Sequence, residues 1–522
     1  MNFNSDVIYQ SHGYRNELLP KMLWNAGREL SRLCWNPFIR RKDSGPITDL
    51  PFDILGEIFQ WCIYDDYGFG PLDARGVLLL EPLVLSHVSR QWREVALSVP
   101  LLWSTIWVDR PRAVHVPMIE LWLQNSRQFP LVLHLRQTVP PSAGQQPLPF
   151  THPREYELTD TVLFLLGNHL HRWKRITFLF HHTAQRSLLS LSESPTAAPL
   201  LEHIQLLNSS WDDHSRAAMG RILYSYASVK SIVMQRKMVQ EFIRWDRLTV
   251  LDVADMGAPI CNYLSVLERC RSLRRADLRI TTNPGENPAI PTTRPLHLDH
   301  LYSLTIKAEL LDLAPFFGCL VLPKLEDLSL NYVTALRRAS DPASLQRLIT
   351  RSGCVLKRFS LREDAPVKKN DDHHLSFLRG AGMLSLLELC LKIDLTDNII
   401  EFLTLGNADD DKDPRPRWLP NLHTIALKDL RGDHVEDIKL YRMVVSRLPP
   451  PTPDRNGRYS AALRRAYFNL RVKDHSLSAV LPVLLERCRE RIDLNVYLSR
   501  CPHQGTIFGR YTAPPLAGGF LP

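Results

Sequence analysis

A short leucine-rich phrase recurs along most of this chain, and it limits the folds that the chain can adopt. The phrase has the form Leu-x-x-Leu-x-Leu with other apolar residues allowed, and ten copies begin at Leu201, Val229, Leu248, Leu273, Leu301, Leu325, Leu356, Leu386, Leu422 and Leu463. Spacings run from 19 residues, between Val229 and Leu248, to 41 residues, between Leu422 and Leu463. Repeats of about this length predict a solenoid, in which each unit buries its apolar face against its neighbours.

The intervals between the copies favour helices. Several helix-like runs end in a cysteine just before the next copy or strand, at Cys270, Cys354 and Cys488. A small cysteine suits close packing of a helix on a strand, so we interpret these three residues as structural rather than reactive. Upstream of the copies, apolar patterns predict strands at 105–108, 131–135 and 176–180 and helices at 118–123 and 162–170.

The sequence therefore predicts an α/β fold in which parallel strands line a concave face and helices lie outside. The repeats resemble irregular leucine-rich repeats. They depart from that family because most copies lack the asparagine that follows the family's Leu-x-x-Leu-x-Leu phrase. The inserted segments 408–416 and 449–458 are expected to be exposed loops.

A second organised stretch precedes the repeats, between Ile47 and Trp103. Thr48 or Asp49 suits a helix N-cap, and Pro51 suits the first turn. Apolar residues then recur at helical spacing, and a second apolar stripe runs from Glu81 until Pro100 stops it. Two short helices cannot bury both stripes by themselves, so we expect the spare apolar surface to pack on something else.

This stretch resembles the F-box. The residues that carry the resemblance are Leu50-Pro51, Ile54, Leu55 and Ile58, then Val88-Ser89-Arg90-Gln91-Trp92-Arg93, and finally Pro100-Leu101-Leu102-Trp103. The resemblance implies docking on the Skp adaptor of a cullin-based ubiquitin ligase, with these adaptor-binding and F-box positions: Leu50, Pro51, Ile54, Leu55, Ile58, Phe59, Val88 and Trp92. The segment between Tyr64 and Glu81 is longer than the usual turn of the family.

These features divide the chain into four parts. We expect an N-terminal extension at 1–46, an F-box at 47–103, a leucine-rich-repeat-like solenoid at 104–500 and a tail at 501–522.

Basic residues recur at one position of the repeats. In five of the last seven copies, the residue just past the last inward position of the strand is basic: Arg279, Lys307, Arg362, Lys392 and Lys428. Asn331 and Asn469 occupy this position in the other two. If the strands stack in register, these residues form a cationic column that would bind an acidic or phosphorylated segment of a target, together with Arg358. The alternative is a solvated strand edge that resists edge pairing.

No motif of an enzyme was found in the sequence. Phosphate-binding, dinucleotide-binding, nucleophile-elbow and zinc-protease phrases are absent, and the nine cysteines form no Cys-x-x-Cys pair. His181-His182 and Asp371-Asp372-His373-His374 make poor metal sites because adjacent side chains diverge, and we interpret both as surface loops. We therefore expect no cofactor, no metal and no catalytic residue.

Composition leaves the location and partners partly open. A net charge of +9 is mild for 522 residues and indicates no nucleic-acid interface by itself. No apolar run is long enough to span a bilayer, and the first residues lack a secretory pattern, so we expect a cytoplasmic or nuclear protein.

The first functional hypothesis is a non-catalytic substrate receptor of a Skp–cullin–F-box ubiquitin ligase, whose repeats bind the target protein. The second is a protein-interaction scaffold that acts without ubiquitin transfer. Nucleic-acid binding through the cationic column is the weakest hypothesis, because the strands that carry the column lack interleaved aromatic residues.

Overall fold

The computed structural model describes sixteen segments and a few single residues between them. The segments are 50–63, 81–137, 155–180, 198–207, 213–223, 228–234, 243–281, 295–309, 313–333, 342–363, 371–405, 418–429, 437–448, 463–472, 492–500 and 509–512. The expected extension, the long turn at 64–80, both loop insertions and most of the tail lie outside these residues. No helix in the described segments is long and apolar enough to cross a membrane.

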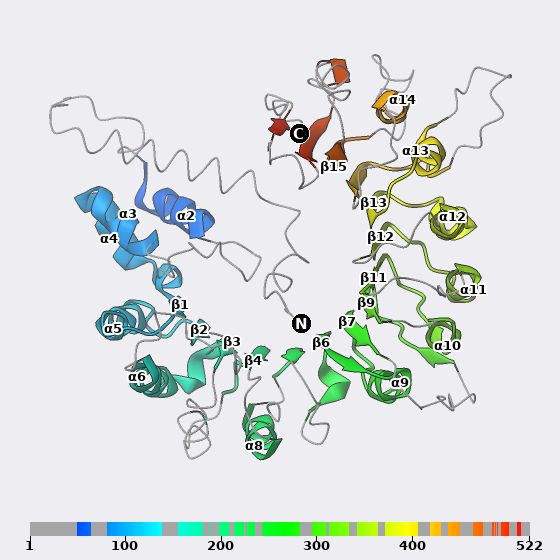
Figure 1. The fold of residues 1–522 in the computed structure, drawn as a ribbon. Helices are drawn as coiled ribbons and strands as arrows, with labels where there is room; N and C mark the ends of the chain where they lie inside the picture. Colours follow the sequence, from blue (N-terminus) through cyan, green and yellow to red (C-terminus); the bar gives the residue numbers. More distant parts are fainter. Residues whose placement is uncertain are drawn as a thin grey trace. The chain divides into compact units, whose positions relative to one another are not determined.

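The fold is α/β, with strands that follow the chain order through a 15-stranded sheet and helices between them (Figure 1). The pairings along this sheet are parallel except the last, where β17 (Gly509–Thr512) runs antiparallel to β16 (Asp493–Arg500). Chain contacts separate two compact units, 1–201 with 206–222 and 202–205 with 223–522. The predicted strand–helix alternation is confirmed.

The first unit begins with helices and continues as strand–helix repeats. Its elements are α2 (Phe52–Ile63), α3 (Glu81–Val88), α4 (Arg90–Ser98), the 3-10 turn η2 (Pro100–Trp103), β1 (Thr105–Asp109), α5 (His115–Asn125), β2 (Leu131–Arg136), α6 (Glu155–Gly167), η3 (Leu170–Arg172), β3 (Trp173–Leu179) and α8 (Asp213–Leu223). Strand β4 (His203–Leu207) crosses the boundary between the units. The three strands and two helices expected upstream of the copies all form.

The apolar stripe after Glu81 forms two helices rather than one. Ser89 interrupts it with an extended backbone (φ −154°, ψ 172°). The Ser89 hydroxyl oxygen accepts a hydrogen bond from the Trp92 backbone N–H at 3.1 Å, so Ser89 acts as the N-cap of α4. Helical spacing continues across this break, so periodicity alone did not show it.

The second unit repeats one strand–helix module. Its elements are β5 (Ser231–Met234), η7 (Trp245–Arg247), β6 (Val250–Ala258), α9 (Ile260–Leu267), β7 (Arg275–Ile280), β8 (Leu296–His297), β9 (Ser303–Ala308), α10 (Ala314–Gly318), β10 (Leu320–Val321), β11 (Asp327–Tyr332), α11 (Pro342–Ser352), β12 (Arg358–Glu363), α12 (Asp371–Leu378), η8 (Ala381–Met383), β13 (Glu388–Ile393), α13 (Asp397–Leu403), β14 (Thr424–Asp429), α14 (Asp437–Ser446), β15 (Arg465–Val472) and β16. Helices α9 to α14 lie on one side of these strands (Figure 1). A small parallel pair of β8 and β10 was not predicted.

The leucines of the repeated phrase form the core of this unit. In β11, Leu328 and Leu330 are buried, while Ser329 between them is partly exposed. Leu325, the first residue of the same copy, is buried in the turn that enters the strand. Alternation puts the other side chains on the face opposite the helices, which we call the open face of the sheet.

Cysteines and arginines lie between the strands of successive repeats. Cys270, Cys354 and Cys488 are buried as expected, and burial raises the pKa of the Cys270 thiol to about 12. The arginines link successive repeats, which the sequence did not indicate. Each donates hydrogen bonds to carbonyl oxygens of the preceding repeat: Arg172 to Phe129, Arg351 to Leu320, and Arg447 to Leu403 and Leu419. Arg447 is almost fully buried, and desolvation lowers its pKa to about 10.

The interpretation of Asp371-Asp372-His373-His374 as a surface loop was wrong. These residues begin helix α12, and His374 is buried against the sheet. Its Nε2 lies 2.9 Å from the Glu363 carboxylate at the end of β12. The four polar residues suggested an exposed loop, because Glu363, the partner of the buried His374, lies on another element, strand β12. His181 and His182 lie outside the described residues.

Candidate functional site

Helix α2 carries an exposed aliphatic face. Ile54 and Ile58, four residues apart and therefore on the same side of a helix, are 49% and 40% exposed. Pro51, one turn earlier, is also exposed. Branched aliphatic side chains that remain this open are unfavourable in water, so this face is a candidate docking surface.

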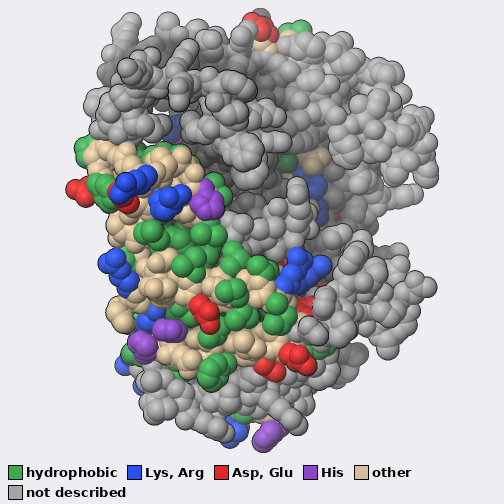
Figure 2. Space-filling view, turned by 90° about the vertical axis from the view of Figure 1, so that its left-hand side faces the viewer, with side chains coloured by type: hydrophobic (Ala, Val, Ile, Leu, Met, Phe, Trp, Pro, Cys, Tyr) green, Lys and Arg blue, Asp and Glu red, His purple; other side chains and the backbone are tan. Residues whose placement is uncertain are grey.

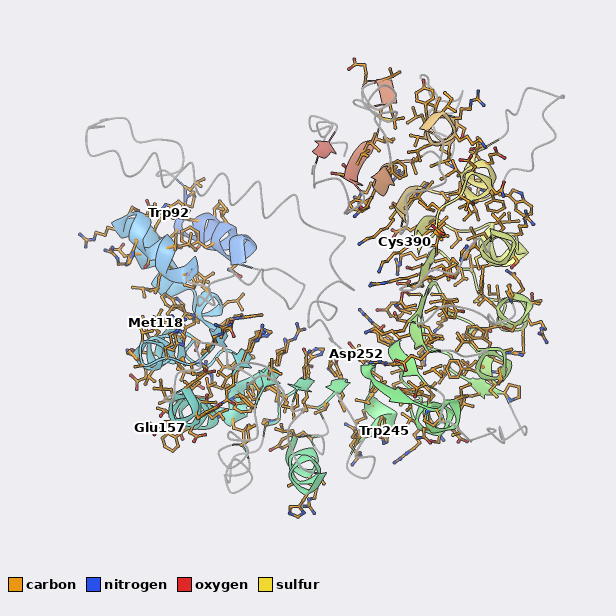
Figure 3. The ribbon with its side chains drawn as sticks, viewed as in Figure 1. Trp92, Met118, Glu157, Trp245, Asp252 and Cys390 are labelled. Carbon is orange, nitrogen blue, oxygen red and sulfur yellow. The ribbon has the colours of Figure 1, made fainter. Side chains whose placement is uncertain are left out.

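The opposite face of α2 packs on α4. Phe59 is buried, and its ring centroid lies 4.8 Å from that of Trp92, which is labelled in Figure 3. Leu55 is buried on the same side as Phe59. Gly56 lets α4 approach closely, because a Cβ at this position would lie 3.3 Å from a methyl group of Val99.

The adaptor-binding positions expected from the F-box resemblance therefore divide into groups. Pro51, Ile54, Ile58 and Val88 are exposed, Leu50 and Trp92 are partly exposed, and Leu55 and Phe59 are core residues. The sequence could not make this division, because it depends on where α4 packs.

Helix α3 has an exposed apolar pair of its own. Val84 and Val88 are four residues apart and are 60% and 41% exposed. Val84 and the exposed Phe52 were not among the expected site residues. The one-turn spacing from Val84 to Val88 was a signal that could have identified the first of these.

Exposed apolar side chains continue over the neighbouring helices of the first unit. Leu97, Leu121 and Phe164 are exposed on α4, α5 and α6. Figure 2 shows hydrophobic side chains gathered on the side of this unit that carries these helices. Exposure alone therefore does not distinguish α2, and these other positions provide matched controls.

Trp103 joins the helical segment to helix α5. Trp103 is buried, and its indole N–H donates to the Ala96 carbonyl oxygen at 2.8 Å. Its ring meets that of Trp122 on α5 edge-on, at 5.1 Å between centroids. The indole N–H of Trp173 likewise donates a hydrogen bond to the carbonyl oxygen of Leu166, seven residues earlier in the chain. The closing Leu-Trp of the segment is thus a structural anchor.

The expected cationic column lies on the open face of the second unit's sheet. The strands stack in register, so one row of directly paired residues contains Arg279, Lys307, Asn331, Arg362, Lys392, Lys428 and Asn469. We call it the cationic row. Its five basic residues come from β7, β9, β12, β13 and β14 and are all partly exposed.

Arg358 belongs to a different row, near the start of the strands. This entry row pairs Arg275, Ser303, Asp327, Arg358, Glu388, Thr424 and Arg465, so positive and negative residues both occur in it. Arg358 lies 3.1 Å from the Asp327 carboxylate, and Arg275 lies 2.9 Å from the buried Asp277. Carboxylates of the same chain therefore compensate the charges of Arg358 and Arg275 in the entry row.

Small side chains separate the two rows. Thr305, Ser329, Ser360, Cys390 and Ala426 form this middle row across β9 to β14. Desolvation raises the pKa of the Cys390 thiol, while a hydrogen bond with Ser360 and the charges of Arg362 and Lys428 oppose the increase. The two basic residues therefore lie near Cys390, which is labelled in Figure 3.

The basic residues differ in their local partners. The Arg279 Nε donates to the Glu309 carboxylate at 2.9 Å, so an acidic residue of the same chain already compensates that end of the row. Arg362, Lys392 and Lys428 follow one another on three adjacent strands. Three consecutive strands therefore each carry a basic residue at the same position of the row.

Comparison with known proteins gives no family assignment. No protein-family model and no curated protein sequence matches the chain. Within the described segments, no group of three His, Cys, Asp or Glu residues is placed to hold a metal ion. The chain is an α/β protein of repeat-like, parallel-sheet architecture with two candidate binding surfaces.

Proposed function

We propose that this protein is a substrate receptor of a Skp–cullin–F-box ubiquitin ligase. The observation that carries the proposal is the exposed Ile54–Ile58 face of α2, within a segment that resembles the F-box in residue order. Fully burying an exposed branched aliphatic side chain is worth about 1.5–3 kcal/mol. Ile54 and Ile58 are 49% and 40% exposed, so docking would gain roughly half of that at each residue.

In this proposal the chain performs no chemistry of its own. The first unit would dock on a Skp-family adaptor, and the open face of the second unit would hold the target. The cullin would bring the ubiquitin-loaded enzyme, and holding both partners together raises the effective concentration of target lysines.

Co-purification of a Skp-family adaptor and a cullin with the full chain tests the proposal. We expect Ile54→Glu/Ile58→Glu to abolish capture of both, because two charges would have to be buried without partners. Leu121→Glu, also at an exposed apolar position, is the matched control and should keep capture. Retained capture in the α2 variant would overturn adaptor docking through this face.

The alternative is a scaffold that acts without ubiquitin transfer. It predicts adaptor capture that depends on Ile54 and Ile58 while no cullin accompanies the adaptor. Quantifying the cullin-to-adaptor ratio in the same purification separates the two functions.

A further inference from the structure

We propose that residues 19–33 of this chain cover the exposed Ile54–Ile58 face of α2 and compete there with the adaptor. These residues lie outside the described part of the chain, so the support comes from their sequence and from the described face of α2. This contact would regulate the docking surface, and it rests on the proposed function only for the identity of the competing partner.

Helix α2 presents two exposed stripes of different chemistry. Ile54 and Ile58 form the apolar stripe and are 49% and 40% exposed. Asp53 and Glu57, each one residue earlier, form a parallel acidic stripe about 100° around the helix, and both are exposed. A segment that covers this face should therefore offer apolar side chains together with positive charge.

The sequence of residues 19–33 has the pattern of an amphipathic helix. Pro20 suits the first helical turn. At helical spacing, six residues fall within one arc of about 100°: Leu19, Met22, Leu23, Ala26, Leu30 and Leu33. Most of the remaining positions are polar or basic. Such a helix buries its apolar stripe only by packing on another apolar surface.

The charge of the N-terminal residues complements the acidic stripe of α2. Residues 20–46 contain six basic residues, Lys21, Arg28, Arg32, Arg40, Arg41 and Lys42, and two acidic residues, Glu29 and Asp43, which gives a net charge of +4. Unlike charges attract over about 10 Å at 0.1 M salt. The carboxylates of Asp53 and Glu57 therefore favour this part of the chain as the occupant.

The connection between the segment and α2 is long enough for the contact. Sixteen residues, 34–49, separate Leu33 from Leu50, and a chain of this length spans up to about 50 Å. Helix α2 has 12 residues and is only about 18 Å long, so residues 19–33 can return along its exposed face. Short tethers give effective concentrations on the order of 1 mM, so a weak contact suffices to occupy the face.

Photo-crosslinking within the full chain, without any adaptor, tests the contact directly. A photoreactive phenylalanine analogue replaces Ile58 in one protein and the exposed Leu121 of α5 in a control protein. Mass spectrometry then identifies the crosslinked peptides. We expect position 58 to crosslink to residues 19–33 and position 121 not to do so. Absence of this crosslink from position 58 would overturn the proposal.

Isotope mixing separates this contact from one between two copies of the chain. Equal amounts of unlabelled and nitrogen-15-labelled protein are combined before irradiation. We expect each crosslinked peptide pair to carry a single isotope label, because both peptides come from one chain. Mixed labels at the frequency of random pairing would overturn the proposal in favour of a second copy.

Variants of the apolar stripe test the competition. Leu23→Glu/Leu30→Glu in the full chain should abolish the crosslink and tighten binding of a purified Skp-family adaptor about tenfold, as measured by titration calorimetry. The control Asn25→Glu/Ser31→Glu adds the same charge outside the stripe and should change neither. An adaptor affinity that is unchanged or lower in the stripe variant would contradict competition.

A basic amphipathic helix can also bind an anionic lipid surface. Flotation of the full chain with phosphatidylserine vesicles measures this alternative. Flotation that depends on Leu23 and Leu30, in a chain that lacks the crosslink from position 58, would overturn the proposal in favour of a membrane.

The regulation and the proposed function fail separately. A chain that crosslinks from position 58 to residues 19–33 but binds no adaptor would keep the intramolecular contact and overturn the competition and the ligase function. A chain that binds the adaptor without that crosslink would keep the ligase function and overturn the intramolecular contact.

Discussion

The two candidate surfaces of this protein use opposite physical chemistry. The exposed face of α2 offers Ile54 and Ile58, whose burial would contribute affinity without regard to salt. The cationic row offers charge at regular strand spacing, with Arg362, Lys392 and Lys428 adjacent. The difference teaches that one chain can carry an apolar surface, where binding would depend little on charge, and a basic surface, where binding would depend on the charge of a partner.

The largest expected effect distinguishes the buried side of α2 from its exposed side. Phe59→Ala removes a buried ring that packs on Trp92 and should lower the free energy of unfolding by about 3–5 kcal/mol. Ile58→Ala, on the exposed face, should lower it by less than about 1 kcal/mol. Denaturant unfolding of both variants measures the difference. Equal losses would mean that Ile58 also belongs to the core.

The pH dependence of stability tests the burial of His134 in the first unit. His134, buried in β2 with its ring stacked on Trp107 at 4.4 Å, has its pKa lowered to about 4 by desolvation and by Arg175. The unfolded chain binds a proton near pH 6.5 and the folded chain does not, so stability is complete above that pH and falls as pH drops towards 4. The loss should reach about 3 kcal/mol.

The His134→Gln variant is the control for this titration. Its denaturant stability in the first unit should change less between pH 6.5 and 4 than that of the unaltered chain. An identical pH dependence in the two proteins would show that other groups control the acid sensitivity.

Salt should separate the two surfaces in binding. Raising sodium chloride from about 0.05 M to about 0.5 M should weaken binding of an acidic target segment at the cationic row by about tenfold or more, because the interaction is screened. Adaptor binding to α2 should change much less over the same range. Anisotropy titrations at several salt concentrations measure both. Parallel salt dependence would contradict the assignment of different chemistry to the two surfaces.

The smallest expected effect concerns the entry row. Arg358→Gln breaks the ion pair with Asp327, and both side chains are about one-third exposed. Such pairs are worth about 1 kcal/mol or less, so the thermal midpoint should move little. A large destabilisation would show that the entry row holds the repeats together rather than only balancing charge.

Much of the fold was predictable because its signals are local. The Leu-x-x-Leu-x-Leu phrase sets which side chains of each strand face the helices, and stacking then brings equivalent positions such as Arg362 and Lys392 side by side. Contacts between distant elements were not predictable. The burial of His374 and the arginine links to preceding repeats each depend on partners outside the local pattern.

The candidate sites show the same limit. Helical spacing identified the apolar residues of α2. It could not show that Ile58 is exposed at the surface whereas the adjacent Phe59 is buried in the core. Gly56 lies on the packed side, where a Cβ would come within 3.3 Å of a methyl group of Val99. Likewise, the basic positions were visible in the sequence, whereas the ion pairs that set Arg279 and Arg358 apart were not.

Site-specific photo-crosslinking tests the central claim that the exposed face of α2 docks an adaptor subunit. A photoreactive phenylalanine analogue replaces Ile58 in one protein and Leu121 in another, and each is irradiated with a purified Skp-family adaptor. The account predicts an adaptor crosslink from position 58 and none from position 121. An adaptor that binds the chain but crosslinks only from position 121, or an adaptor that does not bind at all, would contradict it.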